Sequence, residues 1–298
     1  LNIKKLSNQN IKNLKIPALN YLFKRVDNKK RADIEFEIEL EDKTTRWVLG
    51  SMNTSKTTGD YILVVHDITQ LRQLNSMRRD FISNLSHELR TPVSVIRANS
   101  ETLLDGALDN KKEAKTFARA ILHNSERLSV MVADLIDLSR IEYGDLKLNI
   151  KKIDLISFME NFVTSMKSVT KKKEIEIIFK SNHYDFVKAD PQALERIMNN
   201  LVDNAFKYSE KGSIIEISTN TEYQHVKVMV SDSGVGVSDE DKSHIFARFY
   251  RTASARASDN KGSGLGLAIV KNLTNSLNGE VGVESKNDAG SIFWFTLP

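Results

Sequence analysis

Hydrophobic and polar residues alternate over residues 33–67, near the start of the chain. Three runs show this pattern, the last two separated by a turn-like stretch: 34–40, 46–52 and 61–66. In the first run Ile34, Phe36 and Ile38 share one face and glutamates share the other. A period of two indicates strands with one buried and one solvated face, so we expect an antiparallel sheet here. The preceding residues 1–32 are polar with scattered Ile and Leu, and we expect short helices there.

The spacing of apolar residues becomes helical after residue 67. Two stretches show the 3.5-residue period of a helical seam, one ending near Leu104 and the other at Tyr143. Asp105-Gly106 lies between them and is typical of a turn. Two long amphipathic helices joined by a short loop form a helical hairpin. Because a single hairpin leaves its apolar stripe exposed, we expect two copies of the chain to pair as a four-helix bundle, which makes a homodimer.

Beyond Gly144 short strand and helix patterns alternate. We expect strands at 147–152, 175–180, 185–189, 214–220, 225–232, 280–285 and 291–297, and helices at 155–171, 190–209 and 265–278. This order is typical of an α/β sandwich with its helices on one face of the sheet. The predicted fold is therefore multidomain, α and α+β, with domains at residues 1–67, 68–144 and 145–298.

Composition excludes several classes of protein. The chain has 298 residues, of which 28% are charged and 40% hydrophobic, a balance typical of globular domains rather than disordered ones. It has no cysteine, which excludes disulfides, thiolate metal sites and cysteine nucleophiles. Apolar runs stay well below the ~18 residues that a membrane-spanning helix requires. Because the chain opens at Leu1 in amphipathic sequence, we expect it to be a fragment of a longer protein.

The first long helix contains the segment Ser86–Pro92, which carries a candidate nucleophile. His87 faces away from the apolar seam, Glu88 is next to it, and Thr91 lies one helical turn further on. A neutral imidazole is a competent nucleophile when a carboxylate orients it and accepts its proton. The alternative interpretation is a surface histidine beside an acid.

A second candidate site lies on the helix expected at 190–209. Asn200, Asn204, Lys207 and Tyr208 recur at the spacing of one helix face. Amide oxygens suit Mg²⁺ and a lysine suits phosphate, so this face fits a polar ligand. An ordinary solvated helix face would show the same pattern.

Two glycine-rich segments and the stretch between them are further candidates for a nucleotide site. Asp232–Gly236 follows a strand, where a carboxylate can accept a hydrogen bond from the amine of adenine; an ordinary turn is the alternative. Lys261–Leu267 opens a helix, whose backbone N–H groups can bind phosphates. Between them, the aromatic segment 245–251 leads into the polar loop 252–260, which we interpret as a lid with Arg251 as its phosphate contact.

Taken together and in this order, these motifs resemble the sensor histidine kinases of bacterial two-component systems, over residues 68–298. The hairpin resembles their HisKA dimerisation and phosphotransfer domain. The C-terminal part resembles the GHKL nucleotide-binding fold shared with Hsp90, gyrase B and MutL. Asp67-Ile68-Thr69 resembles the exit of a PAS sensor module, so residues 1–67 are expected to be a partial PAS-like domain. Residues 77–84 resemble the phosphate-regulon type of sensor.

The resemblance implies a role for each motif residue. His87 would attack the γ-phosphate of ATP, and Glu88 would orient the imidazole and accept its proton. Thr91 would position water to dephosphorylate a partner response regulator. Asn200 would hold Mg²⁺ with help from Asn204. The remaining nucleotide contacts would be Lys207, Tyr208, Asp232, Gly234, Gly236, Arg251, Gly262, Gly264, Leu265 and Gly266.

The resemblance also implies cofactors, partners and location. The cofactors are ATP and Mg²⁺, and the phosphoryl group passes from the histidine to an aspartate in the receiver domain of a response regulator. No nucleic-acid partner is expected. The chain would be the cytoplasmic part of an inner-membrane protein whose anchor lies upstream.

Two other classes of protein share part of these features. An ATP-driven conformational protein of the Hsp90 or MutL type explains the nucleotide motifs but not His87, Glu88 and Thr91; ATP hydrolysis that ignores mutation of His87 would favour it. A nucleic-acid-binding module is suggested by the sequence pI of about 9.0, but the chain shows no basic and aromatic stripe.

Overall fold

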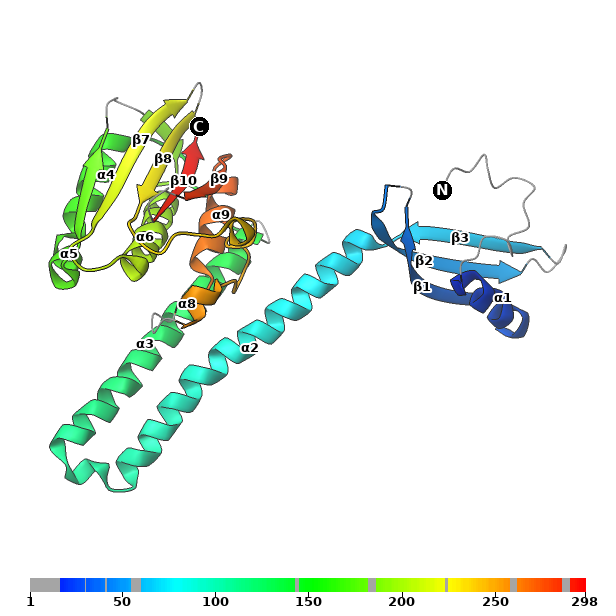
Figure 1. The fold of residues 1–298 in the computed structure, drawn as a ribbon, viewed down its shortest axis with the longest axis horizontal. Coiled ribbons are helices and arrows are strands. Elements are labelled where there is room, and N and C mark those ends of the chain that lie inside the picture. Colours follow the sequence, from blue (N-terminus) through cyan, green and yellow to red (C-terminus); the bar gives the residue numbers. More distant parts are fainter. Residues whose placement is uncertain are drawn as a thin grey trace. The chain divides into compact units, whose positions relative to one another are not determined.

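The computed structural model describes residues 17–29, 31–40, 42–54, 60–142, 145–181, 186–222, 225–257, 262–285 and 290–298 of the chain. These residues form two compact units, Leu1–Ser83 and Asn84–Pro298. Figure 1 shows the elements of both units.

The N-terminal unit is a three-stranded antiparallel sheet with one helix. Its elements are α1 (Pro17–Lys29), β1 (Arg31–Glu39), β2 (Thr45–Thr54) and β3 (Tyr61–Asp67), and the strands lie in the order β1-β2-β3. The expected sheet is therefore confirmed. One helix falls in the region where we expected short helices, while residues 1–16, and 55–59 of the expected turn, lie outside the described residues.

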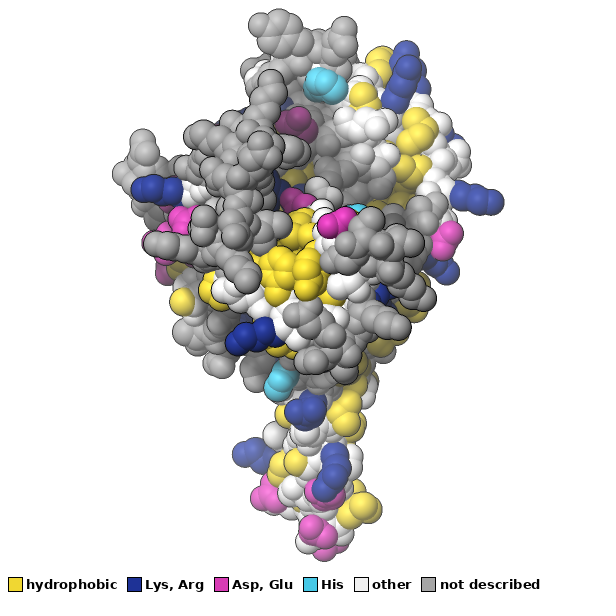
Figure 2. All heavy atoms as spheres, turned by 90° about the vertical axis from the view of Figure 1, so that its right-hand side faces the viewer, with side chains coloured by type: hydrophobic (Ala, Val, Ile, Leu, Met, Phe, Trp, Pro, Cys, Tyr) yellow, Lys and Arg dark blue, Asp and Glu magenta, His cyan; other side chains and the backbone are white. Residues whose placement is uncertain are grey.

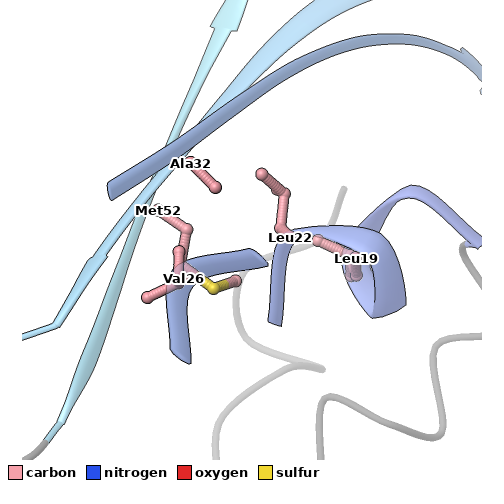
Figure 3. Close-up of a cluster of buried hydrophobic side chains, with 5 residues drawn as sticks. All are labelled: Leu19, Leu22, Val26, Ala32 and Met52. Carbon is pink, nitrogen blue, oxygen red and sulfur yellow. The ribbon is translucent and has the colours of Figure 1, made fainter. Parts of the chain in front are cut away.

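The core of this unit forms where α1 packs on one face of the sheet. Leu19, Leu22 and Val26 of the helix cluster with Ala32 and Met52 of the strands, as Figure 3 shows. The glutamates of β1 are exposed on the opposite face, as their alternation predicts.

The segment that resembles a PAS exit links the sheet to the first long helix. The N–H of Thr69 donates to Asp67 Oδ1 at 2.9 Å, and the N–H of Trp47 on β2 donates to Thr69 Oγ1 at 2.9 Å. Arg46 pairs with Asp67 at 3.5 Å. The helix therefore begins at a point that is hydrogen-bonded to the sheet.

Two long helices form the expected hairpin. They are α2 (Thr69–Leu104) and α3 (Lys111–Glu142), joined by a turn that includes the short 3₁₀ helix Ala107–Asp109. Asn110 caps α3, because its Oδ1 accepts a hydrogen bond from the N–H of Lys112 at 3.1 Å. Within the described parts of the chain, no helix combines the length and hydropathy needed to cross a bilayer.

The hairpin has an exposed apolar surface in the single chain. The exposed side chains include Val93, Leu104, Leu108, Leu122, Val130, Val132 and Ile136. Figure 2, whose lower end is the turn of the hairpin, shows hydrophobic and charged side chains mixed on this surface. A single copy of the hairpin therefore leaves apolar side chains exposed to solvent.

The C-terminal part is a sandwich of helices on a five-stranded sheet. The sheet order is β5-β7-β8-β10-β9, formed by β5 (Glu176–Lys180), β7 (Ile214–Glu222), β8 (His225–Ser231), β10 (Ser291–Leu297) and β9 (Val281–Ser285). Only β5 and β7 are parallel among these pairs. Alternate residues of β8 and β10 are buried, because the helices cover one face. The expected fold class is thus confirmed.

The other elements of the sandwich surround this sheet. They are β4 (Lys151–Asp154), β6 (Phe186–Ala189), α4 (Leu155–Ser165), α5 (Lys167–Lys173), α6 (Pro191–Tyr208), α7 (Asp239–Lys242), α8 (Ala253–Ala257) and α9 (Gly266–Ser276). Strands β4 and β6 pair as a separate antiparallel ribbon.

Two elements depart most from their expected bounds. The strand expected at 147–152 begins only at Lys151, because the N–H of Asn149 donates to the Asp190 carboxylate at 2.6 Å instead of to a neighbouring strand. The helix expected at 155–171 is divided after Ser165. The hydroxyl of Ser165 donates to the carbonyl of Phe162 at 2.7 Å, a side-chain bond that competes with the helical ladder.

Helix α6 owes its fixed start to Asp190. This buried carboxylate accepts hydrogen bonds from the N–H groups of Gln192 and Ala193, in addition to that of Asn149. Burial alone would raise the pKa of Asp190, but the three N–H bonds outweigh it and lower that pKa. A carboxylate with a lowered pKa stabilises the fold above its unfolded pKa of about 3.9 and loses this contribution as the pH falls through its folded pKa.

Asp190→Ala is therefore expected to lower the free energy of unfolding by about 1–2 kcal/mol at pH 7. Asp190→Asn retains an N-cap acceptor and should cost less. Urea unfolding of both variants at pH 7 and at pH 3 measures this, with the difference between wild type and Asp190→Ala shrinking at the lower pH. An equal difference at both pH values would contradict the assigned charge.

Candidate nucleotide and phospho-acceptor site

A cavity of about 460 Å³ lies in the C-terminal unit, where α6, the loop after β8, the start of α9 and one side of α3 meet. Its wall contains most of the nucleotide-site residues expected from the sequence: Asn200, Asn204, Lys207, Tyr208, Asp232, Gly236, Arg251, Gly262, Gly264 and Gly266. Two expected residues, Gly234 and Leu265, lie next to the wall in sequence but outside it, and Leu265 is fully buried.

Helix α6 presents its polar stripe to the cavity because its apolar face is buried. The Nδ2 of Asn200 donates to the carbonyl of Arg196 at 2.8 Å, which leaves Oδ1 as the atom turned toward α9. A Cβ added at Gly266 would lie 2.7 Å from this Oδ1, so glycine is required for the approach. Lys207 Nζ lies 2.5 Å from Asp203 Oδ2.

Asp232 is the buried acid of the site, only 3% exposed. Its Oδ1 accepts hydrogen bonds from the N–H of Gly234 at 2.8 Å and of Ser291 at 3.2 Å. Its own N–H donates to the carbonyl of Ser291 at 2.9 Å. These bonds fix the carboxylate at the end of β8, in a wall that also contains the aromatic ring of Phe293. A flat base with an exocyclic amine suits this combination.

The loop before α9 is held tightly against the aromatic segment. Gly264 has a φ of +71°, and a Cβ there would lie 2.8 Å from the Cα of Phe249. The N–H of Phe249 donates to the carbonyl of Gly264 at 2.9 Å. The glycines therefore bring the backbone at the start of α9 to the cavity, where helix N–H groups favour an anion.

The expected lid is helical at its start. Residues 253–257 form α8, and residues 258–260 lie outside the described residues. The hydroxyl of Tyr250 donates to Asp241 Oδ1 at 2.6 Å, and the guanidinium of Arg251 donates to the carbonyl of Ala255. These bonds hold Arg251 in the cavity wall.

The candidate nucleophile lies on α2 and outside the cavity wall. His87 is exposed, and the hydroxyl of Thr91 donates to its carbonyl at 3.3 Å. Glu88 is half-buried and pairs with Arg127 of α3, with 3.1 Å between Oε2 and Nη2. Arg127 itself lines the cavity, so one ion pair links the wall to the residue next to His87.

Sequence reasoning missed the contribution of α3 to this wall. Arg127, Met131 and Asp134 line the cavity, and Asp134 pairs with Arg196 of α6 at 2.5 Å. Burial raises the pKa of Asp134, while the nearby Arg196 opposes that rise. One signal was present in the sequence: Glu88 and Arg127 are equally far from the centre of the hairpin turn, so they lie at the same height.

The residues present fit a nucleotide with its magnesium ion. Amide oxygens from Asn200 and Asn204 are ligands that Mg²⁺ accepts together with phosphate oxygens and water. Lys207 and the start of α9 supply positive charge and N–H donors for phosphates, and Asp232 supplies the acceptor for a base.

Two domain families match the chain. Residues 189–298 match the family described as Histidine kinase-, DNA gyrase B-, and HSP90-like ATPase, and residues 77–144 match the His Kinase A (phospho-acceptor) domain. The polar stripe of α6 and the glycine-rich segments of the cavity wall lie in the first match, and His87 lies in the second. The fold and the site thus define the class: an ATPase domain joined to a phospho-acceptor hairpin.

Similar proteins agree with this class. The sensor histidine kinase WalK of Bacillus subtilis (strain 168) is 33% identical over 240 residues, which are 80% of this chain and 39% of that protein. The sensor-like histidine kinase SenX3 of Mycobacterium bovis is 35% identical over 237 residues, 80% of this chain and 58% of that protein. The chain is similar to these sensor histidine kinases over most of its length, and it carries the domains of an ATP-dependent protein-histidine kinase. It spans less than two thirds of these two relatives.

Solved structures share the fold. The Acinetobacter baumannii histidine kinase AdeS gives a TM-score of 0.59 at 26% identity, over 71% of this chain and 96% of that one. Full-length ShkA in complex with AMPPNP gives 0.55 at 27% identity, over 74% of this chain and 45% of that one. Histidine kinase ThkA in complex with the response regulator protein TrrA gives 0.63 at 21% identity, over 95% of this chain and 84% of that one, a likeness of fold alone.

Proposed function

We propose that this chain phosphorylates its own His87 from Mg-ATP and then passes the phosphoryl group to an aspartate of a response regulator. One observation supports this most: Arg127 in the wall of the nucleotide cavity is bonded to Glu88, the neighbour of the exposed His87. The expected donor site and acceptor site therefore share a side chain. A protein that only binds or hydrolyses ATP does not require this connection.

The transfer needs little beyond positioning and charge neutralisation. A ring nitrogen of His87 bonds to the γ-phosphorus as the bond from that phosphorus to the bridging oxygen breaks, and ADP leaves with the electron pair. Glu88 accepts the proton from the other ring nitrogen. Magnesium, held by Asn200 and Asn204, would neutralise phosphate charge, and Asp232 would select adenine over bases that lack its amine. The remaining wall residues, including Lys207, would hold the phosphates.

The proposed function also includes two partners for the chain. The exposed apolar stripe of the hairpin fits pairing with a second copy as a four-helix bundle. The phosphoryl acceptor is the receiver domain of a response regulator. The histidine kinase ThkA, which has a similar fold, was solved in complex with the response regulator protein TrrA. The membrane anchor upstream and the phosphate-regulon type, which residues 77–84 resemble, stay predictions.

A pulse–chase experiment tests the proposed transfer. The chain is labelled with ATP carrying ³²P at the γ-phosphate, ATP is removed, and purified receiver domains are added. Label should leave the chain and appear on a receiver domain, and a receiver whose acceptor aspartate is replaced by Asn should take up none. Label that stays on the chain with every receiver tested would contradict phosphotransfer.

We also propose that the chain dephosphorylates its response regulator, and Thr91→Ala is expected to separate this activity from autophosphorylation. The Thr91 side chain is exposed and its bond to the His87 carbonyl is a single surface contact, so autophosphorylation should change by less than about twofold. Dephosphorylation of the regulator should fall about tenfold or more, because no hydroxyl positions the attacking water. Release of phosphate from a phosphorylated receiver domain measures this.

The matched control for Thr91 is on the same helix. Thr102 is also exposed, and its hydroxyl donates to the carbonyl of Ala98 at 2.9 Å in the same i to i−4 arrangement. Thr102→Ala should leave both activities unchanged. Equal effects of the two substitutions would show that Thr91 acts only on the helix backbone.

A further inference from the structure

Arg196 extends the polar stripe of α6 by one turn. It precedes Asn200 by four residues, which places both side chains on the same face of the helix, and both line the cavity. The hydrogen bond from Asn200 Nδ2 to the Arg196 carbonyl belongs to the same turn. The stripe of cavity residues therefore runs from Tyr208 to Arg196, and sequence reasoning ended it at Asn200.

The two ends of this stripe face different surroundings. At the Tyr208 end lies the Asp232 loop, since a Cβ added at Gly234 would be 2.6 Å from the Tyr208 carbonyl oxygen. At the Arg196 end lies α3, since Arg196 pairs with Asp134 at 2.5 Å and Asp137 at 3.2 Å. If the base lies at Asp232, as the proposed function states, a triphosphate along this stripe ends at Arg196.

In this structure the carboxylate of Asp134 lies at the Arg196 end of the stripe, where the terminal phosphate of a nucleotide would lie. Asp134 is 6% exposed and lines the cavity with Arg196, Lys207 and Ser263. Burial disfavours its charge, whereas Arg196, Lys207 and the Ser263 hydroxyl favour it. Within the described part of the chain, the buried Nε of Arg196 has no hydrogen-bond partner. These groups are the donors that a phosphate oxygen prefers.

We infer that Arg196 binds the terminal phosphate of the nucleotide, and that Asp134 of α3 occupies the position of that phosphate in the arrangement seen here. The inference rests on the proposed function, which places the base at Asp232 and therefore the phosphates toward Arg196. A guanidinium binds phosphate and carboxylate in the same forked geometry, so one anion replaces the other. ATP then displaces Asp134 and loosens α3 from α6, whereas ADP, which lacks the terminal phosphate, leaves the pair intact.

The test compares ATP with ADP by titration calorimetry in the presence of Mg²⁺. All proteins carry His87→Ala, so that no phosphoryl transfer disturbs the binding measurement. Arg196→Ala should weaken ATP binding roughly 10- to 100-fold and ADP binding less than about threefold. Arg196→Lys should recover part of the loss, because it restores the charge without the fork. Arg119→Ala, an exposed arginine of α3, should change neither affinity.

A second variant tests the displaced carboxylate independently of Arg196. Asp134→Asn should tighten ATP binding about threefold or more, because the competing anion has been removed, and should leave ADP binding unchanged. The control is Asp137→Asn, which contacts the same guanidinium from outside the cavity wall and should have the smaller effect. If Arg196→Ala fails to fold, the Asp134 comparison still decides.

Three results would overturn the inference. Equal loss of ATP and ADP affinity in Arg196→Ala would place the arginine away from the terminal phosphate. Unchanged or weaker ATP binding in Asp134→Asn would show that Asp134 does not compete with it. Both of these leave the proposed function standing. If the chain with intact Arg196 and Asp134 binds neither nucleotide, the proposed function fails together with this inference.

Discussion

Replacing His87 with Ala is expected to remove ATP-dependent phosphorylation of the chain, with a loss of at least about a thousandfold, because the nucleophile itself is gone. The fold should not suffer, since His87 is exposed on α2 and alanine is a good helix former. Nucleotide affinity should also be unchanged, since His87 lies outside the cavity wall. Gel-based detection of ³²P on the chain, beside a calorimetric titration with ATP, measures both.

His123 offers a matched control for His87. It is an exposed histidine on α3, so His123→Ala makes the same chemical change on the other arm of the hairpin. That variant should retain full labelling. Acid-labile label that persists in His87→Ala, or that disappears in His123→Ala, would contradict the assignment of the phospho-acceptor.

Asp232→Asn is expected to weaken nucleotide binding by about 1.5–3 kcal/mol, which is roughly 10- to 100-fold in affinity. Asn can still accept the N–H bonds of Gly234 and Ser291 through its one oxygen. It then presents an NH₂ donor where the carboxylate presented an acceptor, and the donor opposes the amine of adenine. The loss should fall on ATP, so the preference of the site for ATP over GTP should decrease.

Titration with ATP and GTP measures this effect. Asp239→Asn is the control, because Asp239 is exposed at the start of α7 and lies outside the cavity wall. Undiminished ATP affinity in Asp232→Asn would place the base elsewhere in the cavity. A similar loss for ATP and GTP would show that the substitution disturbs the wall rather than base recognition.

Hydrophobic periodicity alone predicted most of the fold. The alternation around Ile34 gave β1, and the 3.5-residue spacing gave both arms of the hairpin, because in each case the burial of one face determines the pattern. The late start of β4 has a cause that the local pattern does not contain. The N–H of Asn149 bonds to Asp190, a residue 41 positions away.

Part of the candidate site could likewise be predicted from the sequence, and part could not. Residues grouped along one helix face or one loop, such as Asn200 with Asn204, could be found from spacing. The part that α3 contributes could not, because Arg127, Asp134 and Arg196 come together only through the packing of separate elements. An arginine or aspartate in a long amphipathic helix is usually solvated, so its sequence context marks no partner.

The proposed function requires that the chain transfer the γ-phosphoryl group of ATP to a histidine of its own. Incubation with Mg²⁺ and ATP labelled at the γ-phosphate, followed by acid and by alkali treatment of the protein, is the decisive measurement. We expect label that is lost in acid and survives alkali, and no label from ATP marked at the α-phosphate. Nucleotide binding without any label on the chain, or label that resists acid, would contradict it.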